Sequence, residues 1–502
     1  FLMKSKWLRL SVVSGIATFA VACGHQSSKS NAIDKISIGI QGYEFGPAVS
    51  KVILDLKEPV DSLDTSKTKI STAGVDRTIV KSYLSDADGN AVKEGQSSDY
   101  ATLELQVDYS FEDPSKNASP FYYNLSNFMN EWVQDYRVSV DNLMVSGKQK
   151  LSKKEDAIKN RVSKELAAFN KRDSYSGSYT NPLTAKEEKL TLHYAAYEPK
   201  KLEKGAKKPF LVWLHGQGEG GTDTDITLLG NEVTALVRQD IQSHFTSGSD
   251  GKESGAYVLA VQAPTYWMDE GDGTNGAGAG VSRYTEILMD TIKDYVKSNP
   301  NVDPSRIYLA GCSNGGYMTV NLALHYPDYF AALVPQATAY SYYSFERNAD
   351  GTYKKTADQT TGSAGFVKDG GIYFDDEKIK TLSKIPMWFV HAANDQIVQP
   401  TDYALPIYKA LVDSGAENKW FSYYESVAGT DVEGYNYMGH WSWIYFFNNQ
   451  VSGVQDVEKI KNSPELTGFE ASNTSKGGSS TATADGKTYQ NVFKWLNDQS
   501  RK

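Results

Sequence analysis

Cysteine is nearly absent from this sequence: its 502 residues include only two, Cys23 and Cys312. Cys23 lies in the N-terminal leader described below, so a disulfide framework is excluded for the rest of the chain. The fold must therefore be held together by hydrophobic cores, and a hydrophobic content of 40% is enough to build them. A chain of this length is expected to form at least two domains.

An excess of positive charge is also missing, since the formal net charge is −9 at pH 7. A protein that binds nucleic acid broadly needs lysines and arginines to neutralise phosphates, so we expect no nucleic-acid partner. Long apolar runs are missing as well. Beyond the first 22 residues, no stretch of the sequence is long and apolar enough for a transmembrane helix.

The N-terminus has the pattern of an export signal. Lys4, Lys6 and Arg9 precede a short apolar stretch that ends in Ala-Val-Ala-Cys at residues 20–23. Small residues before a cysteine are typical of a bacterial lipoprotein signal, in which that cysteine is acylated. We predict a signal peptide at 1–22, lipid attachment at Cys23, a tether at 23–34 and a protein anchored at the cell surface. The alternative is a plain signal peptide with a chance cysteine.

Residues 35–145 have the pattern of an all-β domain. The segments KISIGI and ATLELQVDY alternate apolar and polar residues, so every second side chain shares one face. Short strands separated by turns such as SDADGNAV indicate a β-sandwich. The charged stretch that follows has apolar residues at helical spacing, and it predicts a helical connector over 146–174. Those apolar residues are Ile158, Val162, Leu166 and Phe169.

Residues 175–502 alternate compact apolar runs with helical patterns, which predicts an α/β domain with a mostly parallel sheet. The expected strands are at 209–216, 256–264, 306–311, 330–337, 385–392 and 419–425. The clearest helical patterns between them are at 283–298, 315–326 and 405–414.

One short motif stands between a strand and a helix of this domain. The segment RIYLAGCSNGGYM contains Gly-Cys-Ser-Asn-Gly at residues 311–315. In this context G-x-S-x-G predicts a nucleophile elbow, a tight turn that presents the serine hydroxyl at the edge of the sheet. We predict Ser313 as the nucleophile. Cys312 is expected to point into the domain as a small packing residue.

A serine nucleophile needs a base, and histidines are few. Of seven histidines, His325, His391 and His440 follow Ser313. On this fold the order along the chain is serine, acid, histidine. His325 ends a helix that leads away from the site and His391 precedes the acid, so His440 is the predicted base. The alternative is that His440 packs structurally beside Trp441.

The acid is expected in the loop after the penultimate strand. Asp395 stands there, with Asp402 as a weaker rival. Its role would be to accept the imidazole N–H of His440, which orients the ring and stabilises the imidazolium.

An oxyanion hole needs two backbone N–H groups, and we expect them from Asn314 and from Gln217 in the loop WLHGQGEGGTD. Gly216 or Gly218 could replace Gln217. Gly216, Gly218 and Gly221 also match the dinucleotide fingerprint G-x-G-x-x-G, but no acid follows at the required place. The segment DEGDGTNG does not have EF-hand spacing. We therefore expect no cofactor and no metal.

Six segments, in order along the chain, resemble secreted α/β-hydrolase esterases of the group that includes feruloyl-type and polyhydroxybutyrate-depolymerase-like enzymes. The resemblance covers roughly residues 175–500 and implies serine carboxylester hydrolysis by Ser313, Asp395 and His440. The segment YEFGPAVSKVILDL and the domain order resemble the immunoglobulin-like N-terminal domain of EstA-type bacterial esterases. The six segments are WLHGQGEGG, LLGNE, IYLAGCSNGGYM, YPDYFAALVP, HAANDQIVQP and GHWSW.

These patterns favour an esterase that forms an acyl-enzyme and acts on short-chain, aryl or hydroxycinnamoyl esters, free or linked to polysaccharide. Some relatives are peptidases of prolyl-oligopeptidase type, so a serine peptidase stays open. In place of the propeller of those enzymes, however, this chain has the β-rich segment 35–145. A non-catalytic surface binding module is the third hypothesis.

Two further segments have open roles. Residues 338–384 are rich in tyrosine and could form a cap over the site or an ordinary surface insertion. The β-sandwich is expected to supply no catalytic group. It would serve as a spacer, or as a wall that narrows the substrate entrance or mediates contact between subunits of a homo-oligomer.

Overall fold

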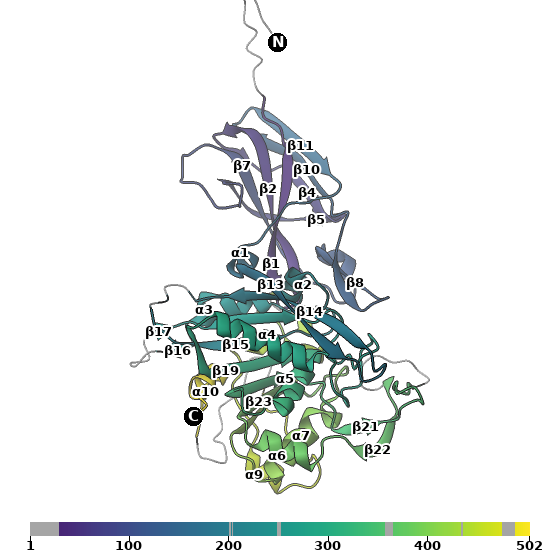
Figure 1. The fold of residues 1–502 in the computed structure, drawn as a ribbon. Helices are drawn as coiled ribbons and strands as arrows, with labels where there is room; N and C mark the ends of the chain where they lie inside the picture. The colour runs from purple at the N-terminus through teal and green to yellow at the C-terminus, as the bar shows by residue number, and fades with distance from the viewer. Residues whose placement is uncertain are drawn as a thin grey trace, which may run out of the picture.

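The computed structural model describes residues 30–199, 202, 204–247, 253–356, 365–432, 435–473 and 487–502. The predicted signal peptide and Cys23 lie outside the described residues, as does most of the predicted tether. The described chain forms a β-rich lobe at its N-terminal end, which stands on a larger lobe of mixed helices and strands (Figure 1). In the described part of the chain, no helix is long and apolar enough to cross a membrane.

The N-terminal lobe is a sandwich of two five-stranded sheets that enclose one core. Alternating residues of both sheets fill this core, as the period-two pattern of the sequence predicts. The first sheet has the order β12-β1-β2-β7-β6, with β12 at Arg161–Val162, β1 at Lys35–Tyr43, β2 at Gly46–Val60, β7 at Ser98–Leu105 and β6 at Ile79–Ser85. The second contains β11 at Gln149–Glu155, β10 at Val138–Val145, β4 at Lys69–Thr72, β5 at Val75–Arg77 and β3 at Leu63–Asp64.

The helical connector predicted over residues 146–174 is wrong for most of its length. Strand β11 pairs antiparallel with β10, and β12 pairs with β1, so the sandwich continues to Val162. A turn at Ser146 and Gly147, both with positive φ, folds β11 back on β10, and the ladder hydrogen bonds outweigh the helical spacing. Only α1, at Lys164–Ala168, is helical.

The larger lobe is built on an eight-stranded sheet in the order β13-β14-β18-β15-β19-β20-β23-β24. The strands from β18 onward run parallel, and β13 and β14 form an antiparallel edge. This confirms the mostly parallel sheet. The bounds are β13 Lys171–Thr180, β14 Glu187–Tyr197, β18 Tyr257–Gln262, β15 Lys208–Leu214, β19 Val302–Cys312, β20 Ala332–Gln336, β23 Met387–Ala392 and β24 Lys419–Tyr424.

Helices cover both faces of the central strands of this sheet, whereas the edge strand β13 is largely exposed. Strand β15 sends Val212 and Leu214 into one hydrophobic layer and Leu211 and Trp213 into the other, so all seven of its residues are buried. One layer is closed by α4 (Thr285–Ser298), α5 (Asn314–His325) and α7 (Ala404–Asp413), and the other by α2 (Thr224–Gly230), α8 (Ile444–Phe447) and α10 (Val492–Asn497).

The remaining elements are short. They are the hairpin strands β8 (Phe121–Asn124) and β9 (Met129–Trp132), β16 (Thr246–Ser247), β17 (Glu253–Ser254), β21 (Tyr343–Phe345), β22 (Lys368–Ile372), β25 (Val427–Ala428), β26 (Asn436–Tyr437), α3 (Gln239–Gln242), α6 (Asp376–Ser383) and α9 (Val457–Lys461), and the 3-10 turns η1 (Pro114–Asn117), η2 (Val233–Val237), η4 (Pro400–Asp402) and η5 (Gly439–Trp441).

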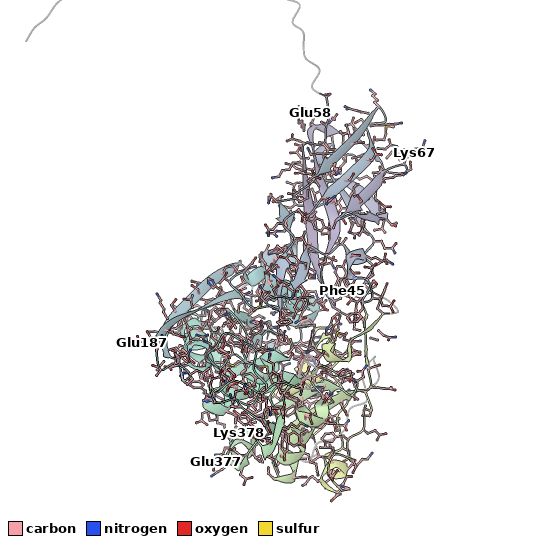
Figure 2. All side chains as sticks on the ribbon, turned by 90° about the vertical axis from the view of Figure 1, so that its right-hand side faces the viewer. Phe45, Glu58, Lys67, Glu187, Glu377 and Lys378 are labelled. Carbon is pink, nitrogen blue, oxygen red and sulfur yellow. The ribbon has the colours of Figure 1, made fainter. Side chains whose placement is uncertain are left out.

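The two lobes meet in a packed junction, where Figure 2 labels Phe45. The Phe45 ring stacks on Tyr109, with their centroids 4.6 Å apart. The buried carboxylate of Glu44 accepts the backbone N–H groups of Thr430 and Asp431, both at 2.9 Å. Apolar side chains and a buried, hydrogen-bonded carboxyl group thus both cross the junction.

Candidate active site

Ser313 stands at the sharp turn between β19 and α5, as the elbow motif predicts. Its backbone has φ 54° and ψ −110°, a conformation that L-residues rarely adopt. The flanking glycines are required by close approach. A Cβ on Gly311 would lie 2.4 Å from the Gly315 carbonyl oxygen, and a Cβ on Gly315 would lie 1.9 Å from that of Leu214. The turn therefore exists only because these positions have no side chain.

Three side chains from separate loops form one hydrogen-bonded line at this turn. His440, in η5, has its Nε2 at 2.9 Å from Ser313 Oγ. Its Nδ1 is 2.9 Å from Oδ2 of Asp395, which follows β23. All three residues are buried, Asp395 almost completely. The structure thus brings together the three residues that the sequence predicts.

Asp395 is held by more donors than His440 alone. Its Oδ1 accepts the backbone N–H groups of Ile397 and Val398, both at 2.9 Å, and its Oδ2 lies 3.2 Å from His391 Nε2. Burial by itself would raise the pKa of this carboxyl, but the charges and hydrogen bonds of His440 and His391 hold that pKa below its usual value. The carboxyl is therefore ionised. The rival acid, Asp402, instead pairs with Lys368 at 2.8 Å.

Cys312 does not face the line of polar side chains. It is fully buried within the apolar layer that contains Trp213, and its Sγ lies 3.7 Å from Asn231 Nδ2. Burial raises the pKa of this thiol well above its usual value. Cys312 is thus a packing residue, as expected.

The predicted oxyanion donors lie at the same end of the sheet. Within the described residues, the backbone N–H groups of Gln217 and Asn314 donate to no acceptor. His215 fixes the start of the Gln217 loop, because its Nε2 accepts the N–H of Ala263 at 3.0 Å and its Nδ1 donates to the Gly216 carbonyl at 2.7 Å. Burial lowers the pKa of His215 to about 4, so the ring stays neutral and keeps this tautomer.

The side chains of the two predicted donor residues are linked through a third amide. Asn275 Nδ2 donates to Gln217 Oε1 at 3.0 Å, and Asn275 Oδ1 accepts from Asn314 Nδ2 at 2.8 Å. At one end Asn314 Oδ1 accepts the Met268 N–H at 2.9 Å, and at the other Gln217 Nε2 donates to Tyr123 Oη at 3.2 Å. We call this chain of four side chains, Tyr123, Gln217, Asn275 and Asn314, the amide relay.

The relay residues Asn275 and Tyr123 were missed by sequence reasoning. Asn275 belongs to the loop DEGDGTNG, in which buried Asp269 accepts the N–H groups of Gly271 and Gly273 at 2.8 and 3.0 Å. A local pattern that folds this loop onto the site was thus present in the sequence. Tyr123 comes from the other lobe, and no local pattern could place it.

The tyrosine-rich insertion packs on the same loop. Arg347 donates to Glu270 Oε1 at 3.0 Å and to the Ala279 carbonyl at 3.2 Å. Strands β21 and β22 form a small hairpin that projects from the lobe (Figure 1). The insertion is therefore seated beside the loop that carries Asn275. Across the described residues, no group of three or more His, Cys, Asp or Glu side chains could hold a metal ion.

Each of the two lobes contains a segment that matches a known protein family. Residues 35–153 match the family described as the esterase Ig-like N-terminal domain. Residues 287–441, which contain the elbow, Asp395 and His440, match the prolyl oligopeptidase family. The two matches together indicate an Ig-like N-terminal domain followed by a domain with the α/β-hydrolase fold. We accordingly call the two lobes the Ig-like domain and the hydrolase domain.

Two curated relatives are similar to part of the chain. Poly(3-hydroxyalkanoate) depolymerase C of Paucimonas lemoignei is 31% identical over 138 residues, which are 27% of this chain and 30% of that protein. An uncharacterized secreted protein of Arthroderma benhamiae is 25% identical over 218 residues, 43% of this chain and 21% of that protein. The chain thus spans less than a third of the length of these curated relatives.

A solved structure shares the overall fold. The crystal structure of a thermostable esterase matches with a TM-score of 0.57 and 21% identity, over 83% of this chain and 97% of that one. The match extends across both the Ig-like domain and the hydrolase domain.

Proposed function

We propose that this protein is a serine carboxylesterase with Ser313 as nucleophile, His440 as general base and Asp395 as the acid that orients it. The observation that carries the proposal is the continuous hydrogen-bonded line Ser313–His440–Asp395, with both contacts at 2.9 Å. The strained backbone of Ser313 supports it, because strain of this kind persists where the surrounding structure enforces it for function.

The geometry supports a two-step reaction. Ser313 Oγ attacks the ester carbonyl carbon while its proton moves to His440 Nε2, and the carbonyl electrons form an oxyanion. Collapse of this intermediate breaks the ester bond, and the departing alcohol takes the proton from Nε2. Water then attacks the acyl-enzyme by the same route and releases the acid. Ionised Asp395 keeps the proton of His440 on Nδ1 and stabilises the imidazolium.

We assign the oxyanion site to the backbone N–H groups of Gln217 and Asn314. Both are free of acceptors among the described residues and flank the elbow. Donors placed in advance stabilise the charge that develops in the transition state, and loss of one such donor costs roughly 10²–10³ in rate. Gly216 and Gly218 are the alternative donors in the same loop, because the backbone N–H groups of neighbouring residues there could also face the oxyanion.

For the substrate, we propose an ester with an apolar or aryl group, which includes short-chain and hydroxycinnamoyl esters. The rings of Tyr123 and Phe128 lie 6.4 Å apart, and both are more than a third exposed. Tyr123 also contacts Gln217, so these rings border the oxyanion loop. Exposed aromatic rings beside a reacting group suit an apolar or aromatic substituent. The similarity to a protein named as a polyester depolymerase favours the same bond type.

A serine peptidase is the second candidate, because residues 287–441 match the prolyl oligopeptidase family. The deciding experiment compares short-chain, aryl and hydroxycinnamoyl esters with peptidyl anilides, each with and without a fluorophosphonate probe. We expect ester turnover that the probe abolishes by labelling Ser313. Turnover of anilides alone would favour the peptidase, and no labelling of Ser313 would favour a non-catalytic binding module.

We also propose that the protein is exported and lipid-anchored through Cys23. The lipobox-like sequence at residues 20–23 supports the anchor, and one similar protein is described as secreted. Metabolic labelling with a palmitate analogue should mark the wild-type protein and fail to mark Cys23→Ser. Equal labelling of both proteins would refute the assignment.

A further inference from the structure

The hairpin β8–β9 belongs to the chain segment of the Ig-like domain but lies beside the hydrolase domain (Figure 1). The backbone N–H of Asn130, in β9, donates to the Gly218 carbonyl at 2.8 Å. At the base of the hairpin, Trp132 Nε1 donates to Asp223 Oδ2 at 2.7 Å. The hairpin is thus bonded to both ends of the segment from Gly218 to Asp223, which continues the oxyanion loop.

The contact between hairpin and loop is also tight. A Cβ on Gly218 would lie 3.3 Å from Asn130 Nδ2 and 3.4 Å from Tyr123 Cε2. A Cβ on Gly220 would lie 3.0 Å from Met129 Cε. At Gly220 the carbonyl oxygens of Thr265 and Ala263 would lie closer still, at 2.3 and 2.9 Å, so it is at Gly218 that the hairpin itself packs directly on this loop.

The amide relay has a single direction, and Tyr123 is its last member. The Met268 N–H can only donate, so it fixes Asn314 with Oδ1 toward Met268 and Nδ2 toward Asn275. The same logic orients Asn275, and then Gln217, whose Nε2 must point to Tyr123 Oη. Partial burial raises the pKa of Tyr123 to about 12 although its ring is partly exposed, so its hydroxyl remains neutral and accepts this bond.

We propose that Tyr123 of the Ig-like domain is a positioning residue for the oxyanion site of the hydrolase domain. Through Gln217 and Asn275 it restrains the two residues whose backbone N–H groups we assign to the oxyanion. This inference rests on the proposed function. With Tyr123 in this role, the Ig-like domain is part of the catalytic unit, although the domain contributes no reacting group.

The test compares two adjacent tyrosines of the hairpin in the full chain. Tyr123→Phe removes the hydroxyl at the end of the relay. Tyr122→Phe is the matched control, because the Tyr122 hydroxyl donates to Glu131 within the hairpin and makes no hydrogen bond to the described residues of the hydrolase domain. A neutral hydrogen bond is worth about 0.5–1.5 kcal/mol, so we expect kcat on a short-chain ester to fall about 2- to 10-fold in Tyr123→Phe.

The kinetic signature separates positioning from simple contact with substrate. Oxyanion donors act in the transition state, so KM should stay within about twofold of wild type in Tyr123→Phe while kcat falls. Tyr122→Phe should have the kcat and the KM of wild type. Wild-type kcat in Tyr123→Phe, or a change in KM alone, would overturn the proposal. Equal losses in both variants would show a general effect of the hairpin and would also overturn it.

A double-mutant cycle tests the relay itself. Asn275→Ala removes its central link, so adding Tyr123→Phe to Asn275→Ala should cost little further kcat. Fully additive losses would show that Tyr123 acts without the relay. Fluorophosphonate labelling of wild type keeps the two hypotheses apart. If the wild-type protein is neither labelled nor active on esters, the proposed function is wrong. If it is labelled and hydrolyses esters, the proposed function holds, and the kinetics of the Tyr123 and Tyr122 variants then test the role of Tyr123.

Discussion

At the scale of single residues, the site combines one strained backbone with several buried polar groups. Ser313 adopts its positive φ between two glycines, and Asp395 accepts three hydrogen bonds while almost fully buried. A buried carboxylate with this many donors stays charged and holds its partner in one orientation. The residues that hold Asp395 and the oxyanion loop, above all His391 and His215, therefore support the geometry of the reacting ones.

We predict that Ser313→Ala lowers ester turnover by about 10⁴-fold or more and leaves the melting temperature close to that of wild type. In the proposed mechanism the Ser313 hydroxyl is the reacting group, and it adds little to packing. Cys312→Ala, one position earlier, should retain most activity, because its thiol faces the apolar layer. Steady-state kinetics and thermal melting of both variants check this. Near-normal turnover in the serine variant would contradict the assignment.

The buried carboxyl of Glu219 should make the free energy of unfolding depend on pH. Burial raises its pKa to about 8, and its Oε2 has no partner among the described residues. At pH values between the ordinary pKa of a glutamate and about 8, Glu219 keeps its proton in the folded state but has lost it in the unfolded state. The free energy of unfolding therefore falls as pH rises through this range. The slope is at most about 1.4 kcal/mol per pH unit.

Glu219→Gln should remove this dependence, and it keeps the Oε1 that accepts from Asn231 at 3.0 Å. We expect the variant to gain stability relative to wild type as pH rises from about 5 to 8. Urea unfolding of both proteins at the two pH values measures the difference. A difference that does not change with pH would show that Glu219 is ionised in the folded protein.

At the scale of elements, the prediction from sequence succeeded where a pattern was local. The apolar runs of β15, β18 and β23 and the G-x-S-x-G turn carry their own signals, and chain order then selected His440. It failed for residues 146–174, where pairing with the distant strands β10 and β1 decided the structure. Local spacing does not contain that information, which also explains why Tyr123 was missed.

The elbow gives a prediction at this scale. Gly315→Ala would place a Cβ 1.9 Å from the Leu214 carbonyl, so β15 or α5 must shift. We expect a loss of several kcal/mol of stability, or no soluble protein. Gly177→Ala, in β13, is the matched control, since the nearest atom to its Cβ would be Ile287 Cδ1 at 3.9 Å, an ordinary van der Waals contact. Denaturant unfolding compares the two, and similar stabilities would contradict the steric argument.

At the scale of the whole molecule, the Ig-like domain meets the hydrolase domain on two sides of the site. The hairpin β8–β9 covers the oxyanion loop, and Tyr109 packs against the segment that carries His440. The Tyr109 ring lies 5.4 Å from Tyr437 and 6.2 Å from Trp441. The sequence left two roles open for the Ig-like domain, a spacer or a wall at the substrate entrance. These contacts on two sides of the site favour the wall.

The last prediction concerns the coupling between the domains. Tyr109 stacks on Phe45 and is almost completely buried by residues of both domains. Tyr109→Ala should therefore cost about 3–5 kcal/mol, the usual range for removal of a large buried aromatic ring. Because the lost contacts lie between the domains, we expect calorimetry to show two separate unfolding transitions in place of the single one expected for wild type.

The control for this prediction is Val80→Ala, since the Val80 side chain is exposed on β6 of the same domain. It should unfold like wild type. Loss of contact beside Trp441 should also free the η5 turn, so kcat of Tyr109→Ala should fall even at temperatures where the protein remains folded. A single unfolding transition together with unchanged kcat in Tyr109→Ala would contradict this prediction. It would mean that contacts across the junction neither couple the unfolding of the two domains nor hold His440 in place.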